Sequence, residues 1–263
     1  MSSEFPDLTF SEDELHRYSR HILLPEVGAT GQARLRDSSV LVIGAGGLGS
    51  PLALYLAAAG VGRIGIVDDD HVELSNLQRQ ILFARQDVGQ EKALRAAAHL
   101  NELNADIEVV PHVMRVNGDS LPALVEGYDV VCDGSDNFTT RYAVADCCHA
   151  MKKTLVSGAV QRFEGTLSTF APHRGGPCYR CLYPDADESA ALSCGQAGIF
   201  GAVTGVIGTL MATEALKELL SLGRSLSGHV LLWNALDASF RSFALPVDPE
   251  CPGCGHPSER ETP

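Results

Sequence analysis

The sequence predicts an α/β fold in which helices cover both faces of a doubly wound, mostly parallel sheet. Three observations predict this fold. Short apolar runs alternate with helical segments between residues 37 and 170. The first run, residues 40–43, leads into a glycine turn with the spacing G-x-G-x-x-G, and a helical segment follows. A second run, 63–67, ends in Asp68, about 20 residues after the turn, where a nucleotide-binding βαβ unit places the acid that holds a ribose hydroxyl.

The glycines of this turn have mechanical roles in a Rossmann-like nucleotide site. Gly44 allows the tight turn, Gly46 lets the backbone approach a phosphate, and Gly49 allows the following helix to pack against the strand. Gly47 belongs to the same turn. The helix at 51–59 presents free N–H groups at its N-terminus, which favour an anionic phosphate. The alternative is a glycine turn with a purely structural role.

The first expected element is a helical arm outside the sheet, whose first helix begins with a capping box made by Ser11 and Glu14. The other elements follow from the spacing of apolar residues. Strands are expected at 40–43, 63–67, 107–113, 128–132, 154–160, 165–170 and 228–234, and helices at 51–59, 89–101, 138–151 and 197–220. One domain is expected over 1–263, with the arm at 8–36, a nucleotide-binding core at 37–170 and a further region at 171–263.

Three polar loops are expected to meet at one edge of the sheet. They are the glycine turn, the stretch that begins at Asp68, and residues 133–137, which follow the strand at 128–132. The carboxyl ends of parallel strands lie at the same edge, and ligands of doubly wound sheets bind there. The sequence therefore predicts a ligand site formed by these loops.

The composition excludes several classes of function. A net charge of −13 argues against non-specific nucleic-acid binding and against an anionic membrane surface, because both need clustered cations. The first residues lack the basic region and apolar run of a signal peptide. Polar and charged side chains interrupt the apolar stretch 197–220, which favours a buried helix over a transmembrane one. We expect a soluble, cytoplasmic protein.

Four of the eight cysteines form two C-x-x-C pairs, Cys178 with Cys181 and Cys251 with Cys254. In a reducing compartment such pairs are more often metal ligands than disulfides. Four thiolates make a closed tetrahedral zinc site, which is structural and would attach the C-terminal segment to the loop near residue 178. The alternatives are two redox dithiols or reactive thiols.

Longer stretches of the sequence resemble a known family. The stretches are 17–20 (Arg-Tyr-Ser-Arg), 44–49, 68–70, 75–80 (Ser-Asn-Leu-Gln-Arg-Gln), 89–92 (Gly-Gln-Glu-Lys), 133–137 and the two Cys pairs. Together they are similar to the MoeB/ThiF family of ubiquitin-activating-type adenylyltransferases over nearly the whole chain. The resemblance implies a homodimer that adenylates the C-terminal glycine of a small ubiquitin-like sulfur carrier of the MoaD/ThiS kind, using ATP.

The implied reaction brings a peptide carboxylate to the α-phosphorus of ATP, so the site needs cations, a metal ion and fixed geometry. In this reading Arg79 and Lys92 neutralise phosphate charge, and Arg20 reaches the phosphates across the dimer interface. Asp136 holds Mg²⁺, which prefers carboxylate and phosphate oxygens. Each residue also has a structural interpretation: a solvated lysine for Lys92, surface ion pairs for the arginines, and for Asp136, together with Asn137, an N-cap of the helix at 138–151.

The same resemblance extends to other residues of the predicted site. Asp68 holds the ribose, Asp70 shares its motif, and Asn76 orients a phosphate or a metal-bound water. Cys194, which precedes the helix at 197–220, matches a cysteine that can accept the carrier as a thioester or acyl persulfide; the alternative is an unreactive cysteine. Some relatives carry a C-terminal sulfurtransferase domain, but this sequence ends shortly after Cys254. A separate sulfur-donor protein is therefore expected.

Two other functions fit parts of the sequence. The glycine turn also suits an NAD-dependent oxidoreductase, although no hydride-transfer residues stand out. A zinc-stabilised protein that binds a partner without catalysis is the second alternative. For the carrier, molybdopterin, thiamine, tRNA-thiolation and siderophore-type pathways all remain open, with a molybdopterin-type carrier as the first choice.

Overall fold

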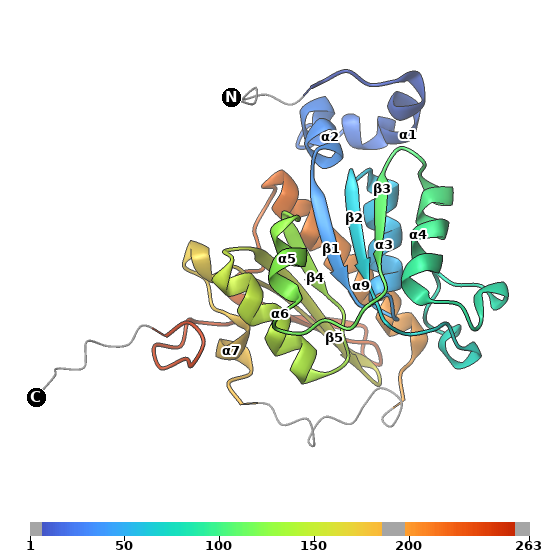
Figure 1. Ribbon diagram of the computed structural model, residues 1–263. Coiled ribbons are helices and arrows are strands. Elements are labelled where there is room, and N and C mark those ends of the chain that lie inside the picture. The colour runs from blue at the N-terminus through green and yellow to red at the C-terminus, as the bar shows by residue number, and fades with distance from the viewer. Residues whose placement is uncertain (1–6, 186–197, 256–263) are drawn as a thin grey trace, which may run out of the picture.

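The computed structural model describes residues 7–185 and 198–255, and within them the strands form one eight-stranded sheet in the order β3-β2-β1-β4-β5-β6-β7-β8 (Figure 1). The strands are β1 Ser39–Ile43, β2 Arg63–Val67, β3 Glu108–His112, β4 Val130–Asp133, β5 Thr154–Gln161, β6 Glu164–Phe170, β7 His229–Asn234 and β8 Ser239–Ala244. Strands β3-β2-β1-β4-β5 pair in parallel, as predicted. Strands β6, β7 and β8 extend this sheet in antiparallel fashion.

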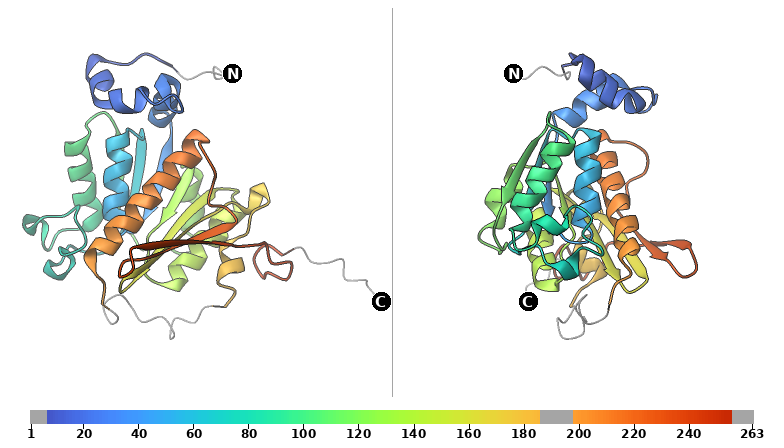
Figure 2. Two further views of the ribbon diagram at one scale, coloured as in Figure 1. Left: turned by 180° about the vertical axis from the view of Figure 1, so that it is seen from behind. Right: turned by 90° about the vertical axis from the view of Figure 1, so that its right-hand side faces the viewer.

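Helices cover both faces of the sheet, which confirms the doubly wound architecture. They are α1 Glu12–Ile22, α2 Gly28–Arg36, α3 Gly49–Ala59, α4 Lys92–Leu103, α5 Leu121–Glu126, α6 Phe138–Ala150, α7 Tyr179–Leu182 and α9 Gly201–Leu220. Helices α5, α6 and α7 lie on the face shown in Figure 1, and α3, α4 and α9 lie on the opposite face in Figure 2. Each layer of helices buries its own hydrophobic cluster against the sheet.

The chain reverses its winding direction between β1 and β4, which are neighbours in the sheet. The connection after β1 leads toward β2, and the connection after β4 leads toward β5. A crevice therefore opens outside the carboxyl ends of β1 and β4, at the topological switch point of the sheet. The predicted loops lie at this position.

The N-terminal arm begins with the capping box that the sequence predicted. The backbone N–H of Glu14 donates to Ser11 Oγ at 3.1 Å, and the N–H of Ser11 donates to Glu14 Oε2 at 2.8 Å, so the capping box is present. Figure 1 shows α1 and α2 beyond the amino end of β1, at the end of the sheet opposite the crevice. The buried Tyr18 fastens the arm, because Asn104 Nδ2 donates to its hydroxyl at 2.9 Å.

The long helix begins later than the sequence predicted. We expected residues 197–220, but α9 begins at Gly201. Gly198 has a φ of 72°, and Ile199 forms a parallel bridge with Arg162, so this stretch is held in a non-helical conformation. Cys194 lies outside the described residues. Among the described helices, none combines the length and apolar character needed to span a bilayer.

Candidate active site

A cavity of about 960 Å³ lies at the carboxyl edge of the sheet, and the three predicted loops contribute to its wall. The predicted site residues that line it are Gly44, Gly46, Gly47, Asp68, Asp70, Arg79, Lys92 and Asp136. Residues distant in sequence are thus brought into one space, and both positive and negative side chains face it. The expected meeting of the glycine turn, the Asp68 loop and residues 133–137 is confirmed.

The glycine turn has the geometry that its spacing predicted. Gly44 has a φ of 86°, in the left-handed region that favours glycine. A Cβ on Gly49 would lie 1.9 Å from the carbonyl oxygen of Gly44, so no other residue fits there without a backbone shift. A Cβ on Gly47 would lie 3.0 Å from Thr204 of α9. The turn therefore packs tightly between the sheet and two helices, while its open side faces the cavity.

Asp68 follows β2 and is fixed by the glycine turn itself. Its Oδ2 accepts from the N–H of Ala45 at 2.8 Å, and its Oδ1 accepts from the N–H of Asp70 at 2.9 Å. Burial raises the pKa of Asp68 above its ordinary value, while the Lys92 ammonium and these two N–H groups act in the opposite direction. Lys92 thus opposes the effect of burial and favours the ionised form of this carboxylate.

Lys92 is a buried ammonium, which contradicts its interpretation as a solvated surface lysine. Its side chain is only 7% exposed, and Nζ lies 2.8 Å from Asp70 Oδ2, whose side chain is 69% exposed. The backbone N–H of Lys92 also donates to the carbonyl of Asp70 at 2.9 Å. Because the first residue of α4 is tied twice to the Asp68 loop, the charge of Lys92 has a fixed position in the cavity wall.

The run 75–80 forms a tight turn that positions two side chains in the cavity wall. Asn76 is buried and does not line the cavity. Its Oδ1 accepts from the N–H of Glu73 at 3.3 Å, and its carbonyl accepts from the N–H groups of Arg79 and Gln80 at 3.0 Å each. Arg79 lines the cavity and donates from Nη1 to the carbonyl of Ser75 at 3.2 Å. In this structure Asn76 shapes the turn that presents Arg79 and Gln80.

The structure of the loop after β4 distinguishes between the two roles that the sequence left open for Asp136, which are metal ligand and helix N-cap. Asn137 is the N-cap of α6, and its Oδ1 accepts from the N–H of Thr140 at 2.8 Å. Asp136 is therefore not the capping residue. Its side chain is exposed in the cavity, and no described residue donates a hydrogen bond to its carboxylate. This carboxylate is available to a cation.

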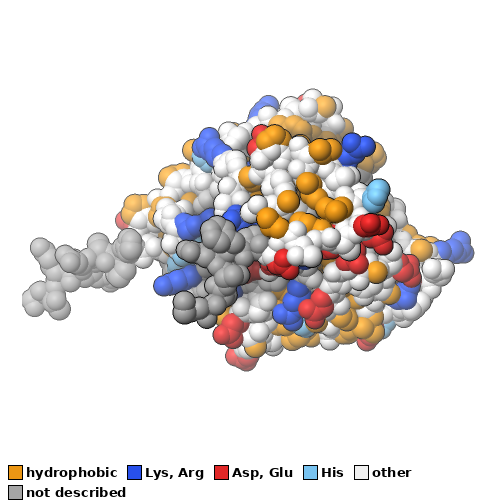
Figure 3. All heavy atoms as spheres, turned by 90° about the horizontal axis from the view of Figure 1, so that it is seen from above, with side chains coloured by type: hydrophobic (Ala, Val, Ile, Leu, Met, Phe, Trp, Pro, Cys, Tyr) orange, Lys and Arg blue, Asp and Glu red, His pale blue; other side chains and the backbone are white. Residues whose placement is uncertain are grey.

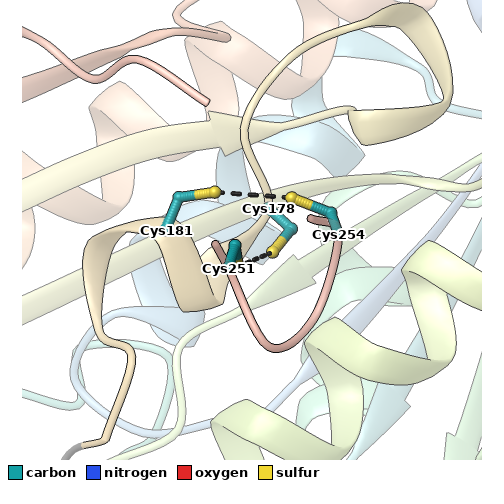
Figure 4. A group of neighbouring side chains, drawn as sticks. All are labelled: Cys178, Cys181, Cys251 and Cys254. Atoms are coloured by element: carbon teal, nitrogen blue, oxygen red, sulfur yellow. Dashed lines mark hydrogen bonds between the residues drawn. The ribbon is translucent and has the colours of Figure 1, made fainter. Parts of the chain in front are cut away.

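The four cysteines of the two C-x-x-C pairs lie together at α7, of which Cys178 is the N-cap and which contains Cys181. Figure 4 shows their sulfur atoms facing one another; Cys178 Sγ lies 3.5 Å from Cys251 Sγ, and Cys181 Sγ lies 3.4 Å from Cys254 Sγ. Four thiolates in one cluster match the donor set of a structural zinc site, so the residues fit this metal. The cluster joins α7, which follows β6, to the C-terminal segment, as the spacing predicted.

A family model described as the ThiF family matches residues 18–253 of the chain. The chain belongs to the ThiF family. Over 260 residues it is 46% identical to the sulfur carrier protein adenylyltransferase of Thermus thermophilus, covering 97% of this chain and 96% of that protein. The SAMP-activating enzyme E1 of Haloferax volcanii is 47% identical, with 94% of this chain and 92% of that protein covered.

Other members of the comparison are longer than this ThiF-family chain. The adenylyltransferase and sulfurtransferase MOCS3 of Bos taurus is 48% identical over 95% of this chain, which spans only 55% of that protein. Among solved structures, E. coli MccB with ATP superposes with a TM-score of 0.80 at 22% identity, covering 95% of this chain and 77% of that one. At this identity the likeness concerns the fold, and it confirms the Rossmann-like architecture.

Among the described site residues that the sequence predicted in this ThiF-family chain, Arg20 lies far from the cavity. Arg20 is exposed on α1, at the opposite end of the sheet, so it does not reach the cavity of its own chain. Cys194 lies outside the described residues, but Asp185 and Gly198, which border its segment in the described part, both line the cavity.

The sequence did not single out three residues of the cavity wall. Gln80 is 4% exposed, and its Oε1 has no hydrogen-bond partner in the described part of the chain. Thr204 of α9 faces the glycine turn, and Arg141 of α6 lies beside the 133–137 loop. Gln80 ends the Ser-Asn-Leu-Gln-Arg-Gln run, which was a usable signal; for Thr204 and Arg141 only the fold brings them to the site.

Proposed function

We propose that this chain catalyses the ATP-dependent adenylation of the C-terminal glycine of a small ubiquitin-like sulfur-carrier protein. The observation that carries the proposal is the meeting of Arg79, Lys92 and Asp136 with the glycine turn in one cavity. ThiF-family relatives at 46–47% identity over nearly their whole length bear names of adenylyltransferases or activating enzymes. These names favour adenylation over the oxidoreductase and the non-catalytic scaffold.

The chemistry needs positioning and charge neutralisation more than it needs a base. The attacking carboxylate of a carrier is ionised at neutral pH, so no general base is required. It must approach a polyanion, and the site lowers that repulsion by placing Lys92 and Arg79 beside the phosphates. The N–H groups of the glycine turn and of the first turn of α3 favour an anion at the same place. Asp68 would hold the ribose and fix the nucleotide in line for attack.

Asp136 fits the role of Mg²⁺ ligand in this reaction. Its carboxylate faces the cavity without a partner among the described residues, and carboxylate oxygens suit this ion. When bound there, Mg²⁺ would neutralise charge on the transferred and leaving phosphates. The other carboxylates of the first loop are less available, because Asp68 accepts two N–H groups and Asp70 pairs with Lys92.

The active form is proposed to be a homodimer in which Arg20 of one chain serves the cavity of its partner. Figure 3 looks down on the arm end of the molecule and shows exposed hydrophobic side chains beside charged ones. The arm contributes four exposed hydrophobic residues, which are Leu8, Leu15, Leu23 and Leu24. An exposed apolar surface of this kind is typical of a protein interface. We also propose that Cys194 accepts the carrier and that a separate protein donates the sulfur.

The decisive experiment is ATP–pyrophosphate exchange with purified ubiquitin-like carriers that end in Gly-Gly. We expect exchange that requires a carrier and is lost when the terminal glycine of that carrier is deleted. A thermal-shift assay with MgATP and with NAD serves as a parallel test. Stabilisation by NAD and not by ATP, together with no exchange for any carrier, would show that the proposed function is wrong.

The cysteine cluster is proposed to hold zinc, and its content can be measured directly. Protein purified without chelators is expected to contain about one zinc per chain, because four thiolates complete one tetrahedral site. Cys251→Ser should lose the metal and lower the melting temperature, since structural zinc supplies folding free energy. Cys147→Ser is the matched control, because this half-buried thiol lies in α6, outside the cluster. Elemental analysis that finds less than about half a zinc per wild-type chain would contradict a zinc site.

A further inference from the structure

The loop that presents Asp136 is fastened by its neighbours and not by Asp136 itself. The N–H of Gly134 donates to the carbonyl of Ile43 in β1 at 3.0 Å. The N–H of Ser135 donates to Asp133 Oδ1 at 2.9 Å. Asp136 has no such contact with a described residue, so the direction of its carboxylate depends on the backbone around it.

The guanidinium group of Arg141 also holds this loop in place through hydrogen bonds. Arg141, one turn into α6, donates to the carbonyl of Ser135 from both Nε, at 3.0 Å, and Nη2, at 2.6 Å. Nη2 also lies 3.5 Å from the carbonyl of Gly158 in β5. The guanidinium group of Arg141 therefore connects the loop after β4 to α6 and to β5.

The surroundings of Arg141 hold it in this position. The Asp133 carboxylate is 1% exposed, and its Oδ2 has no hydrogen-bond partner among the described atoms, so its charge remains available to the guanidinium. Burial has the largest single effect and opposes the charge of Arg141, but Asp133, Tyr179 and Tyr183 together outweigh it, so the pKa of Arg141 lies above its ordinary value. The guanidinium also lies over the ring of Phe138, 6.0 Å from the centroid.

We propose that Arg141 is a positioning residue for the cation site at Asp136: by fixing the carbonyl of Ser135, it aims the next carboxylate into the cavity. The inference rests on the proposed function, in which Asp136 holds the Mg²⁺ that accompanies ATP. Residues that orient metal ligands typically contribute about 10- to 100-fold to metal affinity. A lysine cannot replace the two-point contact, because an ammonium is a point charge without the planar fork.

Direct binding of phosphate by Arg141 is the competing explanation, since this residue also lines the cavity. If Arg141 bound phosphate directly, its loss would weaken ATP binding whether or not Mg²⁺ is present. If it only positions Asp136, its loss would reduce the gain in ATP affinity that Mg²⁺ provides and leave Mg²⁺-free binding nearly unchanged. The two roles therefore differ in a binding measurement that requires no carrier and no turnover.

Isothermal titration of ATP with and without Mg²⁺ tests the proposal on the full chain. Arg141→Lys is expected to lower the Mg²⁺-dependent gain in affinity by about 10-fold or more, with Mg²⁺-free affinity within about twofold of wild type. Asp136→Asn should remove the gain, and the double variant should be no worse than Asp136→Asn alone, because both act on one site. Arg174→Lys is the matched control, since Arg174 pairs with Glu218 and does not line the cavity.

Three results would overturn the inference. They are an unchanged Mg²⁺-dependent gain in Arg141→Lys, an equal loss with and without Mg²⁺, and a double variant whose losses add. Arg141→Gln, which keeps one amide donor for Ser135, serves as a second variant if the lysine variant does not fold. Absence of carrier-dependent exchange in the wild type would refute adenylation, whereas these titrations judge Arg141 separately.

Discussion

Replacing Asp136 by alanine is expected to abolish ATP–pyrophosphate exchange while leaving the fold intact. The carboxylate is exposed in the cavity and makes no hydrogen bond to a described residue, so its loss should change the free energy of unfolding by no more than about 0.5 kcal/mol. A metal ion on a transferring phosphate contributes several kcal/mol to the transition state, which corresponds to a fall of about 10³-fold or more in rate. Exchange kinetics and a thermal melt of the same sample measure both effects.

The control for Asp136→Ala is Asp119→Ala, which removes an exposed carboxylate that does not line the cavity. This control should keep wild-type exchange. Near-normal exchange in Asp136→Ala would remove this residue from the mechanism. A large drop in melting temperature would show instead that Asp136 supports the loop after β4.

Replacing Lys92 by methionine is expected to lower the exchange rate by about 10²- to 10³-fold, the usual effect of removing one preorganised group that stabilises a charged transition state. Methionine preserves the apolar stem in a site that is only 7% exposed, so the change removes mainly the charge. Lys92 also lowers the pKa of the buried Asp68, and its loss should raise that pKa further above the ordinary value. The optimum for nucleotide binding should therefore move toward higher pH.

A comparison of ligands identifies the role of Lys92. Titration should show that Lys92→Met weakens ATP far more than adenosine at pH 8, because adenosine carries no phosphate. Lys152→Met, which changes an exposed lysine outside the cavity, is the control. Equal weakening of both ligands would mean that Lys92 acts through the structure of the Asp68 loop and not on the phosphates.

Local sequence patterns predicted much of the fold. The strand at 63–67 matches β2 at both ends, and the capping box at Ser11 is present. The roles predicted for Gly44 and Gly49 agree with the positive φ of Gly44 and with the close approach of Gly49 to its carbonyl group. Such features depend on neighbours within a few residues, where backbone sterics and hydrogen-bonding options are fixed by the residue types themselves. The resemblance to a family, carried by short runs of this kind, is confirmed for the same reason.

Tertiary structure decided which side chains meet. The sequence did not predict the antiparallel extension by β8, because its residues carry no strong alternation and its pairing with β7 depends on a turn. Two further features were not predicted from the sequence. Asn76 lies outside the cavity wall, and Arg141 of α6 donates hydrogen bonds to the carbonyl of Ser135.

The sequence by itself determined the class of fold, the glycine turn, the acid after β2 and the two C-x-x-C pairs. Each of these features depends on the types of residues that lie a few positions apart in the chain. Only the tertiary structure decided that Lys92 is buried against Asp70, that Asn137 and not Asp136 caps α6, and that the cysteines cluster. The physical reason is that burial and side-chain direction result from packing between elements far apart in the chain, which adjusts until buried charges and backbone groups find partners.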